Sequence, residues 1–162
     1  MKKWIWVAAL AVLLSGCGST KTWETVADEP VEPVMAPMAQ IQVQLPDEAG
    51  LPAIEGDTGR IYLSQDYEIV LQTLEAGDLE ATIRSMSGYE KDQLTVLETR
   101  PQGLKRYDFV WTAAGEEGQL LGRGVVLDDG NYHYTMSVLR PADTTEQTQT
   151  VWRSVFESFT LA

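Results

Sequence analysis

The sequence is short of the residues that most often carry chemistry. Its 162 residues include one cysteine and one histidine, and 12 lysines and arginines stand against 24 aspartates and glutamates, for a formal net charge of −12. One cysteine excludes an internal disulfide and a cage of thiolate metal ligands. The excess of acid argues against nucleic acid as a partner and against electrostatic docking on anionic lipid, because both need clustered lysine and arginine.

The N-terminus, in contrast, carries a clear signal. Lys2 and Lys3 precede an uninterrupted apolar run from Trp4 to Leu14. As a helix, this run spans only ~16 Å at ~1.5 Å per residue, which is short of the ~30 Å hydrocarbon core of a bilayer. The pattern therefore favours a secretory signal peptide over a membrane-spanning helix.

The residues that end this run, Leu14, Ser15, Gly16 and Cys17, resemble the lipobox of bacterial lipoproteins. The resemblance implies a signal peptide over residues 1–16 and cleavage before Cys17, whose thiol then joins diacylglycerol in a thioether bond. Acyl chains such as palmitate then hold the protein on the extracytoplasmic side of the cell membrane or of the outer membrane. The residues alone leave open an ordinary cleavable signal that contains a cysteine, and an uncleaved anchor.

Residues 17–58 are expected to form a tether. Five of the seven prolines lie here, and eight acidic residues but no lysine or arginine lie between Thr22 and Gly59. Proline interrupts helices and central strands, and like charges extend a chain, so the segment suits a spacer that lifts a domain off the lipid surface. The exception is the alternating stretch Ile41 to Leu45, a candidate short strand that docks on the domain edge.

Residues 59–162 are expected to form one α+β domain. A short helix after the second strand has Asp78 as its cap and ends at Gly88, and a C-terminal amphipathic helix begins near Thr144 or Thr145. Hairpins dominate, which predicts a mostly antiparallel β-sheet with both helices packed on it. Alternation of apolar and polar residues predicts the strands, which are residues 60–65, 67–74, 94–99, 104–113, 119–127 and 132–139.

This order of elements resembles the PsbP-like fold, which includes the Ran-binding Mog proteins and the DcrB-type bacterial lipoproteins. The resemblance covers about residues 57–162. It rests on the element order, on Gly88-Tyr89 at the end of the short helix, and on the terminal run from Val155 to Phe159. It implies an architecture and little function, since one branch of the family binds photosystem subunits and another binds a small GTPase.

No catalytic constellation stands out. His133 alternates with Asn131, Thr135 and Ser137 on the more polar side of a strand, where a structural or surface role is expected. The chain has no Gly-x-Ser-x-Gly elbow, and its abundant carboxylates make a chance pair easy to find. The run from Asp128 to Asn131 lacks the ladder of a calcium loop and suits a hairpin turn. We therefore expect no enzyme, no metal and no cofactor.

The aromatic residues are the remaining lead. Tyr107, Trp111, Tyr132 and Tyr134 are candidates for a cleft or a partner surface, although their regular alternation favours a place in the core. The sequence thus predicts a membrane-anchored, non-enzymatic lipoprotein whose domain binds a protein or an envelope component. The alternative is a small-molecule binding module associated with a transporter or a sensor.

Overall fold

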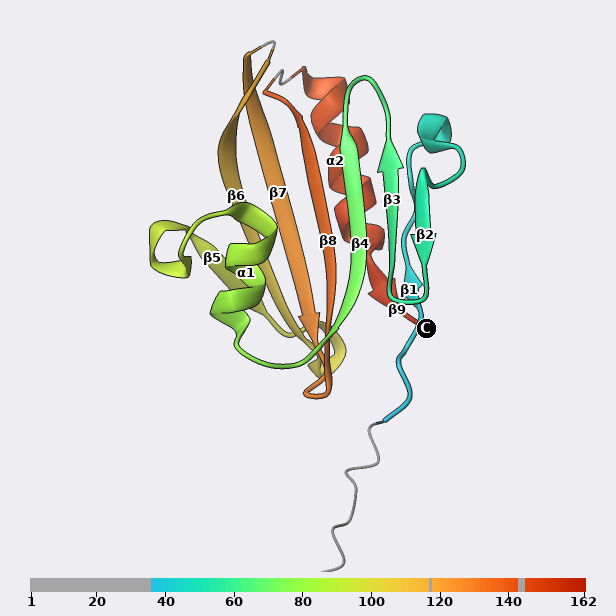
Figure 1. Ribbon diagram of the computed structural model, residues 1–162, viewed down its shortest axis with the longest axis vertical. Coiled ribbons are helices and arrows are strands. Elements are labelled where there is room, and N and C mark those ends of the chain that lie inside the picture. The colour runs from blue at the N-terminus through green and yellow to red at the C-terminus, as the bar shows by residue number, and fades with distance from the viewer. Residues whose placement is uncertain (1–35, 117, 143–144) are drawn as a thin grey trace, which may run out of the picture. The chain divides into compact units, whose positions relative to one another are not determined.

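Two α-helices pack on opposite faces of a mostly antiparallel sheet (Figure 1). The structure is a computed structural model that describes residues 36–116, 118–142 and 145–162. The expected α+β class is confirmed. In chain order, the elements are β1 (Ile41–Gln42), a 3₁₀ helix (Asp47–Ala49), β2 (Ile54–Gly56), β3 (Gly59–Leu63), β4 (Glu68–Glu75), α1 (Leu79–Ser87), a 3₁₀ helix (Lys91–Gln93), β5 (Val96–Thr99), a 3₁₀ helix (Pro101–Gly103), β6 (Lys105–Gly115), β7 (Gly118–Asp128), β8 (Tyr132–Pro141), α2 (Glu146–Ser158) and β9 (Thr160–Leu161).

The main sheet has seven strands in the order β2-β3-β4-β8-β7-β6-β5, and all neighbouring strands are antiparallel. Strand β4 pairs with β8 along its whole length, which brings the first half of the domain against the second. Strands β1 and β9 pair with each other in a separate two-stranded sheet. The register of these strands fixes which side chains share a face, because successive residues point to opposite sides.

One core lies between the sheet and α2. Ile69 of β4, Tyr134 of β8 and Phe156 of α2 meet there, and each is at most 1 % exposed. Thr145 caps α2, since its side-chain oxygen accepts a hydrogen bond from the backbone N–H of Thr148 at 3.3 Å. The C-terminal helix predicted from its amphipathic pattern is therefore confirmed.

The second core lies between the sheet and α1. The carboxylate of Asp78 caps α1 by accepting a hydrogen bond from the backbone N–H of Glu80 at 3.0 Å. Gly88 ends the helix in the left-handed conformation, with φ of 78°, which glycine adopts without strain. Ile83, which is fully buried, packs from α1 onto the aromatic residues of β6. Both predicted ends of this helix are confirmed.

Two glycines of β7 make room for the aromatic rings of that second core. Gly122 is the cross-strand partner of Trp111, and Gly124 is that of Phe109. A Cβ atom would lie 2.0 Å from the Trp111 ring at Gly122 and 2.5 Å from the Phe109 ring at Gly124. The two rings therefore lie directly over the bare backbone of β7, and a larger residue does not fit at either position.

The folded unit begins well before residue 59. The compact unit that contains all described residues is Met35–Ala162. Strand β1 pairs with β9, Ile41 and Leu45 pack against the α2-side core, and the backbone N–H of Ala39 donates to the Tyr134 hydroxyl at 3.0 Å. The structure thus differs from a tether that continues to residue 58, because the apolar alternation of this stretch outweighs its prolines and acids. The predicted docking of residues 41–45 is confirmed.

The turn predicted at Asp128 to Asn131 is confirmed as the hairpin between β7 and β8. One carboxylate oxygen of Asp129 accepts hydrogen bonds from the backbone N–H groups of Asn131 and Tyr132, at 2.8 and 2.7 Å. The other accepts from the Tyr134 hydroxyl at 3.0 Å. The Asp129 carboxylate is therefore used to build the turn.

The expected signal peptide and Cys17 lie outside the described residues. Within the part of the chain that the structure describes, no helix has the length and apolar character needed to cross a membrane.

Candidate binding cleft beside the C-terminal helix

The four aromatic candidates do not share one surface. Tyr107 and Trp111 lie in the α1-side core, whereas Tyr132 and Tyr134 lie in the α2-side core. Each of the four is at most 8 % exposed. Since they belong to opposite faces of the sheet, they cannot line one cleft, and their alternation reflects the two cores.

His133 lies in a buried structural site. It is 2 % exposed, and its Nδ1 atom lies 2.8 Å from the Thr82 hydroxyl oxygen, a contact that ties β8 to α1. Burial lowers the pKa of His133; the charges of Asp128 and Asp129 act in the opposite direction, and Lys105 adds to the lowering. The polar side of β8 is thus covered by α1, which leaves this histidine a structural role instead of a surface one.

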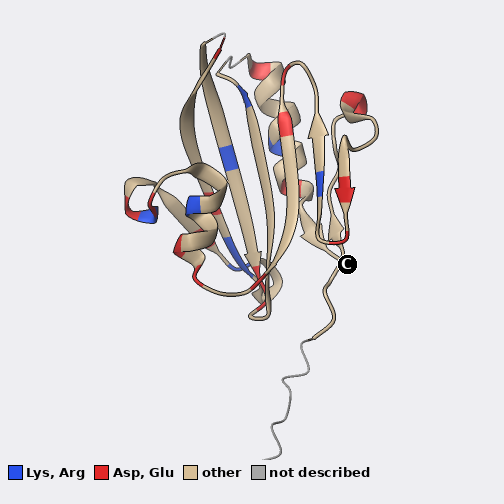
Figure 2. Ribbon diagram, in the orientation of Figure 1, with Lys and Arg blue, Asp and Glu red and all other residues tan. Residues whose placement is uncertain are grey.

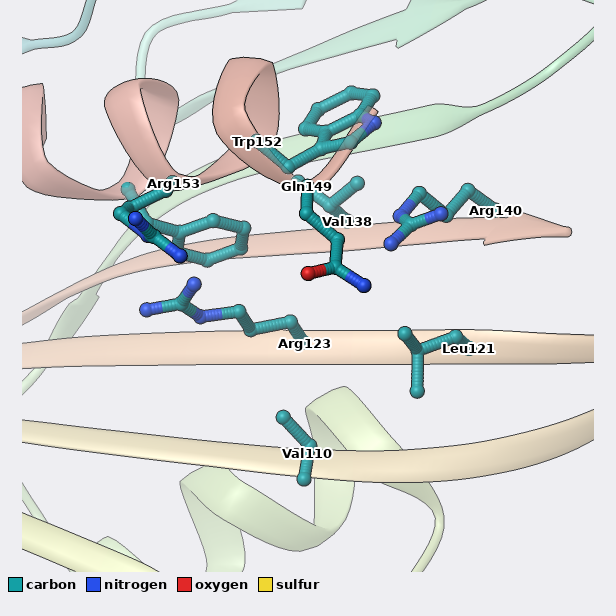
Figure 3. Close-up of a pocket in the computed structure, with 9 residues that line it drawn as sticks. Val110, Leu121, Arg123, Val138, Arg140, Gln149, Trp152 and Arg153 are labelled. Carbon is teal, nitrogen blue, oxygen red and sulfur yellow. The ribbon is translucent and has the colours of Figure 1, made fainter. Parts of the chain in front are cut away.

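A cleft of about 260 Å³ lies between α2 and the strands β6, β7 and β8 (Figure 3). Three arginines line it, and each comes from a different element: Arg123 from β7, Arg140 from β8 and Arg153 from α2. Figure 3 shows Arg123 and Arg153 toward one end, Arg140 toward the other, and the Gln149 amide between them. The remaining lining residues are Val110, Leu121, Val138, Trp152 and Phe156.

Strand register builds the floor of this arginine cleft. Arg123 has Val110 and Val138 as its cross-strand partners, and Leu121 lies opposite Arg140. Arg123 and Arg140 are therefore diagonal neighbours on adjacent strands, a relation that places residues ~7–8 Å apart. The wall comes from α2, whose residues 149, 153 and 156 are four and three positions apart and so share one helix face.

Arg123 is held between a carboxylate and an aromatic ring. Its guanidinium carbon lies 4.1 Å from the centroid of the Phe156 ring, and its Nη2 atom lies 3.4 Å from Asp108 Oδ1. Arg106 already donates to both oxygens of Asp108, at 2.7 and 3.2 Å, and also to the backbone oxygens of Phe156 and Phe159 at the end of α2. One carboxylate thus serves two guanidinium groups, so the local charge remains positive.

Trp152 borders the cleft from α2, but it is 8 % exposed and belongs to the α2-side core. Its ring meets the Tyr67 ring edge to face, with centroids 5.1 Å apart and planes at 76°, which fixes its orientation. Across the cleft, Val110 is 52 % exposed because α2 does not cover β6. The arginines are therefore placed beside apolar surface that remains open to solvent.

Positive charge gathers here in an otherwise acidic domain. From residue 59 onward the chain has nine lysines and arginines against 16 acids, and three of the nine line the cleft, whereas none of its described lining residues is acidic. Figure 2 shows basic segments on β7, β8 and α2, the elements that enclose the cleft. A larger hollow of about 630 Å³ lies between the β3–β4 turn and the ends of β6, β7 and β8; it has three acidic lining residues and shares Arg140 with the cleft. Arg123 pairs with Asp108, and the six bases outside the cleft also pair with carboxylates: Arg60, Arg84, Lys91, Arg100, Lys105 and Arg106.

This arrangement fits the recognition of an anion. Guanidinium groups bind carboxylate and phosphate through paired N–H donors in a fixed plane. The described lining residues include no serine, cysteine, histidine or acid, so they offer neither a nucleophile nor a general base. Among the described residues, no group of three or more His, Cys, Asp and Glu side chains is placed to hold a metal ion.

The sequence patterns did not predict the arginine cleft. Its three arginines are separated by 17 and 13 residues and belong to no motif. One signal was present: Arg123 alternates in phase with Val125 and Leu127, which are core residues, so a charge falls on the apolar face of a strand. An arginine on the core-facing side of a strand indicates that the covering helix leaves this part of the sheet open to solvent.

Comparisons with known proteins give likenesses in structure alone. No family model matches the chain, and no curated protein matches its sequence. A mutant of the protein Mog1 is similar in structure, with 12% identity and a TM-score of 0.47 over 75% of this chain and 90% of that chain. The Saccharomyces cerevisiae Ran-binding protein Mog1p is similar at 11% identity and a TM-score of 0.47, over 75% of this chain and 89% of that chain.

Proposed function

We propose that the chain is a membrane-anchored, non-enzymatic binding module of the cell envelope, and that its domain binds a protein or an envelope component through the arginine cleft. The observation that carries this proposal is the convergence of Arg123, Arg140 and Arg153 in one cleft of an acidic domain. A concave site with apolar walls and a few convergent polar groups is typical of ligand recognition.

The anchor is supported by the lipobox-like residues that end at Cys17. A lipid on Cys17 is joined to the described domain by residues 18–35, which reach at most about 65 Å when fully extended.

A second candidate is a small-molecule binding module associated with a transporter or a sensor. The observation in its favour is that the cleft is concave and has both apolar and polar lining residues. Its volume of about 260 Å³ is below the ~300–1,000 Å³ of sites for drug-sized ligands, so it suits a smaller molecule.

The binding proposal is tested by crosslinking and affinity capture from cells that carry the tagged chain. A double variant, Arg123→Gln with Arg153→Gln, should lose the captured partner. The matched control, Arg84→Gln with Arg100→Gln, removes the same charge from exposed positions outside the cleft and should keep it. Equal capture by both variants, or no partner above background across several growth conditions, contradicts the proposal.

The anchor is tested separately by fractionation. Cys17→Ser should release the protein from membranes or leave its signal peptide uncleaved, because serine cannot form the thioether. Continued association with membranes after cleavage at the correct site contradicts the lipoprotein assignment.

A further inference from the structure

We infer that the arginine cleft holds a small acidic group, a carboxylate or a phosphate, joined to an apolar or aromatic part. This inference rests on the proposed function, since it names the chemistry of what the cleft binds. It follows from the charge, the apolar wall and the size of the cleft.

The charge at one end of the cleft is only partly balanced. Arg123 makes a single 3.4 Å contact with Asp108, whose two oxygens already accept hydrogen bonds from Arg106. Arg153, which lines the same cleft, forms no ion pair within the described residues. An arginine has five N–H donors, so these two side chains offer several donors to an incoming anion. An anion between them also relieves the repulsion of two like charges.

The donors are already partly fixed in position. Stacking on Phe156 and the contact with Asp108 restrict the Arg123 guanidinium, whose side chain is 36% exposed. A restricted donor loses less conformational entropy when it binds. Partial exclusion of water also strengthens its interaction with a charge. Arg123 is therefore a better anion-binding group than an exposed, mobile arginine.

The apolar wall selects what the acidic group is attached to. Trp152 is held by Tyr67, and Leu121 and Val110 lie across the same cleft. A ligand that carries an aromatic ring or a short hydrocarbon part covers the exposed Val110 and the half-buried Leu121, beside Trp152, while its acid faces the arginines. A volume of about 260 Å³ admits one such group, which is either a free aromatic acid or the terminal part of a larger molecule.

Four probes test this inference on the expected mature chain, residues 17–162, made soluble by Cys17→Ser. Phenyl phosphate and benzoate carry both parts of the ligand, benzamide lacks the charge, and inorganic phosphate lacks the ring. In an NMR titration, we expect the first two to shift the Trp152 indole N–H resonance saturably. We expect benzamide not to shift it and inorganic phosphate to bind more weakly.

The arginine variants locate the binding. Arg153→Gln and Arg123→Gln should each lower the affinity for phenyl phosphate by about ten-fold or more, as expected when a charged hydrogen bond is lost. Arg153 is exposed, so its substitution leaves the fold intact even if that of Arg123 does not. Arg84→Gln is the control and should leave the affinity unchanged.

Three results overturn the inference: no saturable shift with phenyl phosphate or benzoate, equal binding of benzamide, or an affinity that Arg153→Gln does not change. Each leaves the proposed function standing if affinity capture still depends on the cleft arginines.

Flotation with phosphatidylcholine vesicles, with and without phosphatidylglycerol, identifies the source of the acidic group. We expect no flotation, as for a free acid; flotation that needs phosphatidylglycerol and Arg153 supports the same chemistry with a lipid headgroup as its source.

Discussion

The two faces of the sheet are closed in different ways. On the α1 side, aromatic rings lie over the bare backbone of Gly122 and Gly124, and the buried His133 is tied to Thr82. On the α2 side, the helix covers β4 and β8 but leaves part of β6 and β7 open (Figure 1). Arg123 of β7 lines the cleft at that margin. Both sides therefore hold a core that supports the fold, but only the α2 side leaves a charged side chain at a margin that water still reaches.

The largest expected effect concerns the residue that belongs to both the α2-side core and the cleft. Phe156 is 1 % exposed and stacks on Arg123. Phe156→Ala should lower the free energy of unfolding by about 3–5 kcal/mol, because it leaves a cavity and frees the arginine. Urea denaturation measures this change in the free energy of unfolding. Val151→Ala, on the same helix but 41 % exposed, should cost far less, and equal losses contradict this packing.

The next effect tests how tightly the α1 side is closed. Gly122→Ala places a methyl group against the Trp111 ring and should lower the free energy of unfolding by about 1–3 kcal/mol. Gly77→Ala is the matched control, because a Cβ atom there meets nothing within 4 Å. Thermal unfolding of both variants gives the comparison. A Gly122→Ala protein as stable as the control would show that the ring does not lie over this strand.

A smaller effect depends on pH. Burial, opposed by Asp128 and Asp129, holds the pKa of His133 below its ordinary value of 6.5, so the folded state favours the neutral ring. The unfolded chain therefore binds more protons just below that pH, and stability falls as the pH decreases through 6.5. Denaturation in a pH series should show this loss of stability below pH 6.5 and before the carboxylates titrate at about pH 4.

The variant His133→Gln separates this effect from other titrations. Glutamine carries no titratable proton, so the variant should show a flatter dependence of stability on pH between neutrality and the carboxylate range. The same slope in both proteins assigns the effect to another group.

The comparison of the two faces also explains which features the sequence predicted. The caps Asp78 and Gly88, the hairpin at Asp129 and the alternation along β8 are local patterns, so they were predicted correctly. The arginine cleft depends on the register between β7 and β8 and on the path of α2, which no local pattern contains. The folded residues before Gly59 were assigned to the tether although a local pattern was present. The prolines and acids of this segment outnumbered its short apolar alternation.

Photo-crosslinking in the living cell compares the two faces of the sheet directly. A photo-crosslinking amino acid is placed at Val110, at the rim of the cleft, or at Leu63, which is similarly exposed on the α1 face of β3. We expect a specific crosslinked partner or ligand from position 110, lost when Arg123→Gln and Arg153→Gln are added, and none from position 63. A specific crosslink from position 63 alone would show that the arginine cleft is not the functional face.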